Sequence, residues 1–414
     1  MSGNAILVAG GGFSGITAAL EAAELGYEVI LVEKNPYLGG RVAQLNQYFP
    51  KLCPPSCGLE IQFQRIRNNP KITVLTQACV TKVSGQAGNF DVTVTITPRY
   101  VNEKCTACDA CAEAAETRVP CEFDLGLGMR KVAFRPNMFA FPMRYVFEKD
   151  RCPEAEAKKI EAACKYGAID LADKERTQVF KVGAIVQATG WKPYDMAKLT
   201  NLGAGKLKNV ISNMQMERLC APNGPTGGLL LRPSDKAAPK RVAFVQCAGS
   251  RDENHLNYCS YICCMASLKQ VTYVRERVPD AQVSVFYIDL RAPGRYQKFL
   301  EKVAADPKLS LVKGKVADLT ESPSGTVLAT VENVETGIKN IEEFDLVVLA
   351  TGMQPSTAGE SVAVNAPKDE EGFFIADAPG VVATGCAKLP LDVMRSAQSA
   401  TGAALKAIQT VAGR

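Results

Sequence analysis

The feature that most constrains this chain is a glycine-rich turn between two apolar segments near its N-terminus. Residues 5–9 are apolar and have the length of a buried strand, and residues 16–25 are rich in Ala and Leu, as in a helix. A second apolar segment, 27–32, ends at Glu33. The turn contains G-x-G-x-x-G, so the pattern predicts a strand–helix–strand unit that binds a dinucleotide.

Each glycine of this motif has its own expected role. Gly10 permits the tight turn, Gly12 lets the backbone approach a pyrophosphate, and Gly15 lets the helix pack on the strand. The pyrophosphate is expected at the helix N-terminus, where free N–H groups favour negative charge. Glu33 is expected to bind the ribose hydroxyls, and a plain glycine-rich turn would leave it unexplained. The turn residues expected to contact the dinucleotide are Gly10, Gly12, Phe13, Ser14 and Gly15.

The residues after the second strand indicate which dinucleotide is bound. Residues 33–41 (EKNPYLGGR) resemble a run found in flavoproteins with two dinucleotide-binding domains, of the thioredoxin reductase kind, where it marks FAD. Residues 188–190 and 350–352, both A-T-G, resemble strand ends near FAD in that family. Cys386 stands where the family has an acid, so this contact differs. The further FAD contacts that the resemblance implies are Lys34, Gly40, Arg41, Val80, Ala188, Thr189, Gly190, Thr351, Gly352, Gly385 and Cys386.

The resemblance implies an α/β fold, with the two-dinucleotide-binding flavoprotein architecture interrupted by a degenerate ferredoxin domain. The segment between the β-branched runs near 90–97 and 182–188 is rich in cysteine and marks this insertion. The expected segments are a first FAD part (1–100), the inserted domain (101–176), an FAD continuation and connector (177–240), a nicotinamide-type domain without an NAD site (241–345) and a last FAD part (346–414).

Composition excludes several classes of protein. The 414 residues carry a net charge of only +5 without a basic run, so the sequence does not predict a nucleic-acid partner. The uncharged stretch 1–20 is broken by glycines, which argues against a signal peptide or a membrane span. We therefore expect a cytoplasmic protein that reaches a membrane only through a partner.

Cysteine usage predicts metal chemistry. The chain has 15 cysteines, in clusters, and a single histidine, His255. Clustered thiols without a signal peptide indicate metal ligands or redox groups rather than disulfides. With one histidine, the expected groups are iron–sulfur clusters or zinc ligated by thiolates alone.

The first cysteine group resembles a ferredoxin motif. Three cysteines follow the spacing C-x2-C-x2-C, and a later one begins the run Cys164-Lys165-Tyr166-Gly167-Ala168. In two-cluster ferredoxins the fourth cysteine of each run ligates the other cluster. This rule predicts one [4Fe–4S] cluster, with Cys121 as a competing fourth ligand and zinc as the alternative metal. The predicted ligands are Cys105, Cys108, Cys111 and Cys164.

The second cluster of such a ferredoxin is expected to be lost. Its run would begin at Cys152, but Ala155, Lys158 and Ala115 occupy the other ligand positions. Cys152 is therefore interpreted as a vestige.

Another cysteine group replaces a nicotinamide site. The strand expected from residue 241 runs into Cys247-Ala248-Gly249-Ser250-Arg251 without a glycine-rich fingerprint, so we predict no NAD(P) binding. Closely spaced thiols follow, including an adjacent pair whose side chains diverge. Spacing alone leaves a second [4Fe–4S] cluster and packed thiols as equal alternatives. The candidate ligands are Cys247, Cys259, Cys263 and Cys264.

Several runs are similar to those of the heterodisulfide reductase A subunits. These are 246–251 (QCAGSR), 258–265 (YCSYICCM), 104–108 (KCTAC) and 122–128 (EFDLGLG). The resemblance implies FAD with several [4Fe–4S] clusters, and it favours a cluster on the Cys247 group, so we expect two clusters in all.

Two departures from that family are expected to matter. The chain begins at the FAD motif and ends without a further ferredoxin domain. This plan resembles that of the A subunits in the quinone-interacting membrane-bound oxidoreductase complexes of sulfate reducers. It implies sister B and C subunits, adenylylsulfate reductase as electron acceptor, and a peripheral position on the cytoplasmic face of the inner membrane. The expected function is electron relay, with bifurcation or confurcation left open.

Cys53 and Cys57 are candidate catalytic thiols. They follow the flavin motif within a turn that contains Pro54 and Pro55. A thiol–disulfide reductase that uses NAD(P)H is the main alternative function, although C-x3-C does not match the thioredoxin-like C-x-x-C. A scaffold that only holds clusters is a third, and packed thiols without a role remain equally favoured for this pair.

Overall fold

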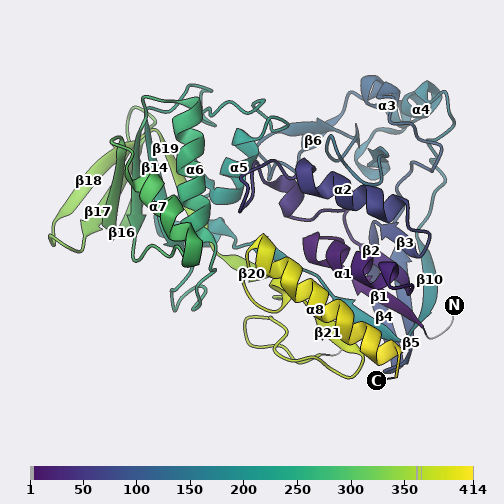
Figure 1. Cartoon of the computed structure of the whole chain (residues 1–414). Coiled ribbons are helices and arrows are strands. Elements are labelled where there is room, and N and C mark those ends of the chain that lie inside the picture. Colours follow the sequence, from purple (N-terminus) through teal and green to yellow (C-terminus); the bar gives the residue numbers. More distant parts are fainter. Residues whose placement is uncertain (1–3, 360–361, 365, 414) are drawn as a thin grey trace. The chain divides into compact units, whose positions relative to one another are not determined.

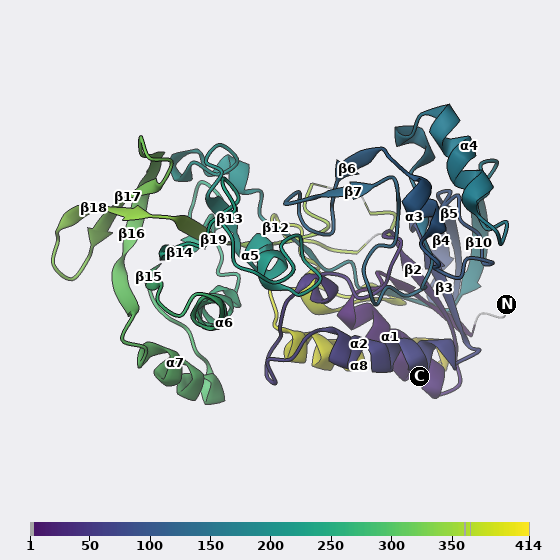
Figure 2. The same cartoon turned by 90° about the horizontal axis from the view of Figure 1, so that it is seen from above.

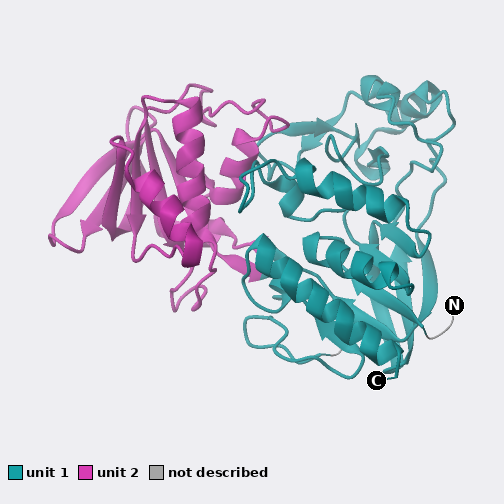
Figure 3. Ribbon diagram, in the orientation of Figure 1, with its two compact units in different colours: residues 1–191, 355–414 teal, residues 192–354 magenta. Residues whose placement is uncertain are grey.

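A computed structural model describes residues 4–359, 362–364 and 366–413 of the chain. Backbone contacts divide it into two compact units (Figure 3), each considered by itself below. Unit 1 comprises Met1–Trp191 with Pro355–Arg414, and unit 2 comprises Lys192–Gln354. The five segments expected from sequence stay a prediction, and the first and the last of them include residues outside those described.

Unit 1 is built on a five-stranded parallel sheet with the order β21-β11-β1-β2-β3. The strands are β1 (Ala5–Ala9), β2 (Glu28–Glu33), β3 (Ile72–Thr76), β11 (Ala184–Gln187) and β21 (Val381–Ala383). Helix α1 (Phe13–Glu24) joins β1 to β2 and begins three residues earlier than the predicted 16. The predicted strand–helix–strand unit is therefore present, with Gly26 at φ +96° ending the helical segment.

Two layers cover this sheet. Helices α1 and α8 (Val393–Val411) run beside one another on one face (Figures 1 and 2), with α2 (Ser56–Arg67) next to α1. Strands β4 (Ala78–Gln86), β5 (Asn89–Ile96) and β10 (Arg176–Val182) form an antiparallel sheet, whose apolar side chains share the core of the opposite face. Alternation along β1 explains the two cores, since Ile6 and Val8 belong to one and Leu7 to the other.

The start of helix α2 differs from what the sequence predicted. The sequence predicts a turn around Cys53 and Cys57, but α2 begins at Ser56 and includes Cys57. Pro55 precedes the first helical residue with φ −57°, a backbone angle suited to a helix start.

The inserted segment lies between β5 and β10 and has little regular structure. Helices α3 (Ala110–Ala114) and α4 (Glu154–Ala163) lie next to one another (Figure 2). Their side chains share a small core with Val132, Phe147 and Ile169. The short strands form two antiparallel pairs, β6 (Arg118–Pro120) with β7 (Met129–Lys131) and β8 (Ala133–Phe134) with β9 (Val146–Phe147).

Unit 2 contains a seven-stranded sheet with the order β13-β19-β14-β15-β16-β17-β18. Parallel pairing runs from β13 to β16, and β16, β17 and β18 are antiparallel. The strands are β13 (Val210–Ser212), β14 (Arg241–Ala248), β15 (Gln282–Tyr287), β16 (Leu309–Glu321), β17 (Val327–Asn333), β18 (Lys339–Phe344) and β19 (Leu346–Thr351). The helices are α5 (Asn213–Cys220), α6 (Cys263–Arg277) and α7 (Gln297–Ala304).

Two elements of unit 2 differ from the sequence interpretation. The expected connector contains β13 and α5, which begins with a capping box between Ser212 and Gln215, a sequence signal that could have revealed the helix. Strand β19, expected in the last FAD segment, is instead paired between β13 and β14. Its six residues are all buried, as a central parallel strand requires.

The remaining elements are short. Strands β12 (Trp191–Pro193) and β20 (Met353–Pro355) pair with one another where the chain passes between the units. None of the helices in the described residues has the length and apolarity needed to cross a membrane. The 3-10 helices are η1 (Val42–Gln44), η2 (Lys149–Arg151), η3 (Met196–Lys198), η4 (Thr200–Leu202), η5 (Gly294–Tyr296) and η6 (Gly385–Ala387).

Candidate flavin and cysteine sites

Packing requires two of the three motif glycines in the first turn. Gly10 has φ +114°, and a Cβ there would lie 2.2 Å from Ala188 O. A Cβ on Gly15 would lie 1.8 Å from Gly10 O, so helix α1 could not approach the turn. The predicted roles of these two glycines in the turn and in helix packing are therefore physical requirements of the fold.

Gly12 differs from Gly10 and Gly15, because packing does not require a glycine at its position. Its φ of −73° suits any residue, and the nearest atom to a Cβ there, among the described residues, would be Gly40 Cα at 3.9 Å. Within the described part of the chain no side chain caps the N-terminus of α1 at this residue. The fold alone thus gives no reason for glycine here, whereas a pyrophosphate approaching the helix N-terminus would.

Glu33 is buried at the end of β2 and already engaged. Its Oε2 accepts a hydrogen bond from Gly11 N at 2.7 Å, and its Oε1 accepts bonds from Asn35 N and Asn35 Nδ2 at 2.8 and 2.7 Å. Burial raises the pKa of Glu33, and these hydrogen bonds oppose the rise. Carboxylate oxygens have further lone pairs, so ribose hydroxyls can still be accepted.

Gly40, another residue predicted to contact FAD, packs against the same glycine-rich turn. A Cβ on Gly40 would lie 2.9 Å from Gly12 Cα, and Arg41 donates hydrogen bonds to Trp191 O at 3.3 Å and Gln44 Oε1 at 3.0 Å. Thr189 follows β11, and its buried Oγ1 has no hydrogen-bond partner among the described residues. An orphaned hydroxyl beside the glycine turn fits a site that awaits a polar ligand.

The other predicted FAD residues have varied surroundings. Gly385 lies against Ser14, because a Cβ on Gly385 would be 2.2 Å from Ser14 Oγ. The Cys386 thiol is buried and contacts Leu391 O at 3.5 Å, and burial raises its pKa.

Val80 lies on β4 at the edge of the second core, while Thr351 Oγ1 donates to Asn213 Oδ1 within unit 2. The side chain of Lys34 is exposed, and Ala188 and Gly190 flank Thr189; Gly352 follows β19 in unit 2.

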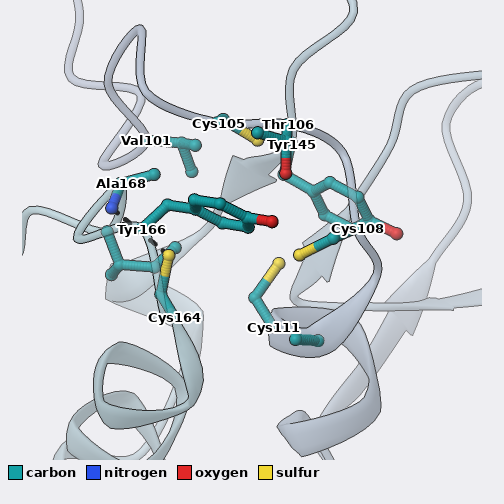
Figure 4. Close-up of a pocket in the computed structure, with 11 residues that line it drawn as sticks. Val101, Cys105, Thr106, Cys108, Cys111, Tyr145, Cys164, Tyr166 and Ala168 are labelled. Carbon is teal, nitrogen blue, oxygen red and sulfur yellow. Dashed lines mark hydrogen bonds between the residues drawn. The ribbon is translucent and has the colours of Figure 1, made fainter.

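The four cysteines of the first predicted cluster line one pocket of the insert (Figure 4). Cys105 and Cys108 come from the loop before α3, Cys111 from α3 and Cys164 from the end of α4. Ala107 and Asp109 have φ of +56° and +66°, which lets the loop curl between its cysteines. Topology thus brings together the residues that the ferredoxin rule selected.

The pocket has an apolar wall and one sulfur that is already hydrogen bonded. Ala168 N donates to Cys164 Sγ at 3.2 Å, and burial raises the pKa of Cys111 to about 12. Tyr166 extends its ring from the Cys164 side toward Cys108 and Cys111 (Figure 4). Within residues 4–359, 362–364 and 366–413, no group of three or more potential ligands is arranged so that it could hold a metal ion.

The competing cysteines of the insert do not line this pocket. Cys121 packs against the first core of unit 1, and burial raises its pKa to about 11. The Cys152 thiol contacts Pro153 O at 3.6 Å. Sequence reasoning missed the aromatic wall, Tyr145 and Tyr166, although Tyr166 lies two residues after Cys164 in the ferredoxin-like run.

The second cysteine group gathers between β14 and α6. Cys247 is the penultimate residue of β14 and has φ +56°, Cys259 lies in the following loop, and Cys263 and Cys264 begin α6. Burial raises the pKa of Cys263 well above its usual value, and the other three thiols raise it further, so the four are neighbours. They occupy the strand-to-helix turn where a nicotinamide domain would hold the dinucleotide phosphates.

Charged residues around this group were not predicted. Arg251 donates a hydrogen bond to Cys247 and pairs with Asp289, which also accepts from Arg291 at 3.1 Å. Cys264 Sγ contacts Asp289 O at 3.6 Å. Arg251 belongs to the run 246–251 that carried the family resemblance. This run is the sequence signal that could have identified Arg251 as part of the site.

Cys53 and Cys57 lie together at the start of α2. The two side chains hydrogen bond with one another, and this bond raises the pKa of Cys57 above its ordinary value. Cys57 is exposed and Cys53 is half-buried. The structure therefore brings the two candidate catalytic thiols into contact.

Comparison with known proteins first defines the class. Residues 5–99 match the family described as FAD dependent oxidoreductase. Thioredoxin reductase from Lactococcus lactis has a similar fold, with a TM-score of 0.56 at 13% identity over 99% of this chain and 100% of that one. The thioredoxin reductase of T. acidophilum gives 0.53 at 13% identity, over 99% and 97%. The chain is thus a flavoprotein of the predicted two-dinucleotide-binding fold.

Sequence relatives match nearly the whole chain. The chain is 37% identical to the second iron–sulfur A subunit of CoB–CoM heterodisulfide reductase in Methanopyrus kandleri, over 98% of this chain and 64% of that protein. It is 34% identical to the A subunit of the H2:CoB–CoM heterodisulfide,ferredoxin reductase in Methanothermobacter marburgensis, over 97% and 63%. The chain is thus similar over nearly its whole length to heterodisulfide reductase A subunits, and it spans less than two thirds of the length of these relatives.

Proposed function

We propose that this chain is an FAD and [4Fe–4S] electron-transfer component of a multi-subunit oxidoreductase. The observation that carries the proposal is the coexistence of an FAD-type turn in unit 1 with four cysteines around one pocket of the same unit. When bound, a flavin exchanges two electrons and a cubane cluster one, so a protein that holds both can relay electrons between partners.

The FAD site is supported by steric and hydrogen-bonding features of the turn. Gly12 leaves open space at the N-terminus of α1, and Thr189 offers an unsatisfied hydroxyl among the described residues. Glu33 is fixed by the N–H groups of Gly11 and Asn35, so its carboxylate needs no reorientation to receive a ribose. These residues would hold the nucleotide, and the missing side chain of Gly385 leaves room for Ser14.

The pocket residues fit a cubane cluster better than zinc. The C-x2-C-x2-C loop with a distant fourth cysteine is the ferredoxin arrangement. Apolar side chains of Val101, Ala110 and Ile169 complete the lining and would exclude water from a bound cluster. Ala168 N would keep its hydrogen bond to the Cys164 sulfur, an interaction that tunes cluster potential.

The Cys247 group is the proposed second cluster site. Adjacent Cys263 and Cys264 share the first turn of α6, so a cluster here would be ligated asymmetrically. Because these thiols fill the turn after β14, we propose that unit 2 binds no NAD(P).

The partners are proposed to be sister B and C subunits, with adenylylsulfate reductase as the electron acceptor and the quinone pool as the other electron source. The half-degenerate insert supports this assignment, because Ala115, Ala155 and Lys158 remove one cluster of the ferredoxin pattern. The chain would then lie on the cytoplasmic face of the inner membrane, held there by its partners.

Iron, acid-labile sulfide and flavin counted per chain on anaerobic protein test the proposal. We expect one FAD and about eight irons, since each cubane contains about four. NADPH should leave the flavin oxidised, whereas reduced partner subunits should bleach it. Flavin without iron, bleached by NADPH, would replace the proposal with a thiol–disulfide reductase.

Gly12→Ala separates ligand binding from folding. The fold has room for the methyl group, so we expect unchanged stability, while FAD retention falls at least about ten-fold because the methyl group would collide with the pyrophosphate. Gly402→Ala is the matched control, because a Cβ there, within α8, meets nothing within 4 Å among the described residues. Flavin absorbance after gel filtration and the unfolding midpoint give the two readouts. Equal FAD retention in both variants would contradict the proposed site.

A further inference from the structure

One pair of thiols is left without a role by the proposed electron relay. Cys53 ends the turn before α2, where its carbonyl accepts a hydrogen bond from Tyr48 N at 3.2 Å. Cys57 lies in the first turn of α2, and its N–H donates to Pro54 O at 3.1 Å. The two side chains also hydrogen bond with one another, so the two thiols lie close together.

The two thiols differ in accessibility. Cys57 is exposed on α2, whereas Cys53 is half-buried. The Tyr48 hydroxyl contacts Cys53 and also fills the space above Gly58, since a Cβ on Gly58 would lie 2.5 Å from it. An outer thiol open to solvent and an inner thiol within reach of it form the arrangement needed for attack followed by resolution.

We infer that Cys53 and Cys57 form a redox-active dithiol, which exchanges with a low-molecular-weight disulfide and closes to a Cys53–Cys57 disulfide. The Cys57 thiolate attacks the disulfide R–S–S–R, which forms a mixed disulfide and releases one R–S⁻ that is protonated to RSH. The Cys53 thiolate then attacks Cys57 Sγ, and a second RSH leaves. The protein loses two electrons and two protons, and the small disulfide gains both.

The close contact between the two thiols is what makes resolution within the chain possible. A mixed disulfide formed at Cys57 has the Cys53 thiol already beside it, so the second exchange needs no further molecule. Cys79, on β4, is exposed as well. The cysteines nearest to it in the sequence are the distant Cys57 and Cys105, so Cys79 serves as a comparison for an exposed thiol without a second cysteine close by in the sequence. The inference goes beyond the proposed relay and does not depend on it.

The test treats the full, anaerobic protein with oxidised glutathione, followed by an acid quench and alkylation. Trypsin cleavage after Lys51 and Arg65 isolates both thiols in one peptide, 52–65. We expect this peptide to become lighter by two hydrogens and to take up no alkyl group, and dithiothreitol to reverse the change.

Three variants make the order of attack visible. In Cys53→Ser the reaction should stop at a glutathione adduct on Cys57, and in Cys57→Ser the remaining thiol should react at least about ten-fold more slowly because it is less accessible. Cys79→Ser is the control and should leave peptide 52–65 reacting as in the wild type.

Either of two results would overturn the inference. One is a wild-type protein that accumulates the glutathione adduct on Cys57 as Cys53→Ser does. The other is a peptide 52–65 whose two thiols are both alkylated after treatment. Iron and flavin are counted on the same samples, so a failure of this inference can be told apart from a failure of the relay proposal.

Discussion

Cys164→Ala is expected to remove the cluster of the insert and to lower the iron content from about eight to about four atoms per chain. Cys164 is the only one of the four pocket cysteines outside the contiguous C-x2-C-x2-C loop, and it closes the site from the end of α4. Without the Cys164 thiol the pocket keeps three cysteine thiols, so a cubane cluster would lack its fourth ligand.

The measurement combines iron and sulfide content with the electron paramagnetic resonance spectrum of the reduced protein. Cys152→Ser is the matched control, because Cys152 lies in the same insert but does not line the pocket, and its variant should keep about eight irons. A second readout is hydrogen exchange across 101–176, which should speed up in Cys164→Ala because metal binding contributes folding energy. Full iron content in Cys164→Ala would refute the ligand assignment.

Arg99→Ala is expected to destabilise the protein by about 3–5 kcal/mol, because each buried carbonyl left without its donor costs about 1–2 kcal/mol. The Arg99 guanidinium is buried and donates to Tyr145 O at 2.8 Å, Pro36 O at 2.9 Å and Arg144 O at 3.0 Å. Burial lowers its pKa to about 9, which still leaves it charged at neutral pH. It thereby ties the insert to the loop that follows β2.

Urea unfolding with hydrogen exchange would measure this effect, with the fastest new exchange expected in the insert. Arg118→Ala, at an exposed position of β6, is the control and should change stability by no more than about 0.5 kcal/mol. Arg99→Lys should recover part of the loss, since an ammonium can reach some of the same carbonyls. If Arg99→Ala unfolds like the control, the insert is held by other contacts, such as the 3.0 Å bond from Gln44 Nε2 to Phe123 O.

Part of the candidate site could be predicted because its signal is local. The glycine turn, α1 and Glu33 follow one another within a single strand–helix–strand unit, where apolar periodicity and backbone sterics specify the structure. The pocket cysteines were predictable for another reason, since the pairing rule of ferredoxins links positions that are distant in sequence.

Other parts depended on contacts that sequence patterns do not record. Arg99 gave no signal, because three of its hydrogen bonds go to the main-chain carbonyls of Tyr145, Pro36 and Arg144, whose side chains take no part in these bonds. The contact between the Cys53 and Cys57 side chains required knowing that α2 begins at Ser56. The aromatic wall of the pocket depended on how Tyr145 packs beside the α3 loop.

By itself the sequence determined the class of the protein, its dinucleotide turn and the identity of the thiols that come together in the insert, because each follows from short-range periodicity or from fixed ligand spacing. Only the tertiary structure decided that β19 belongs to the sheet of unit 2, that Gly12 is free of packing constraints and that Arg99 fastens the insert. The physical reason is that burial, steric room and main-chain hydrogen bonding arise between segments remote in sequence, and they exist only once the chain has folded.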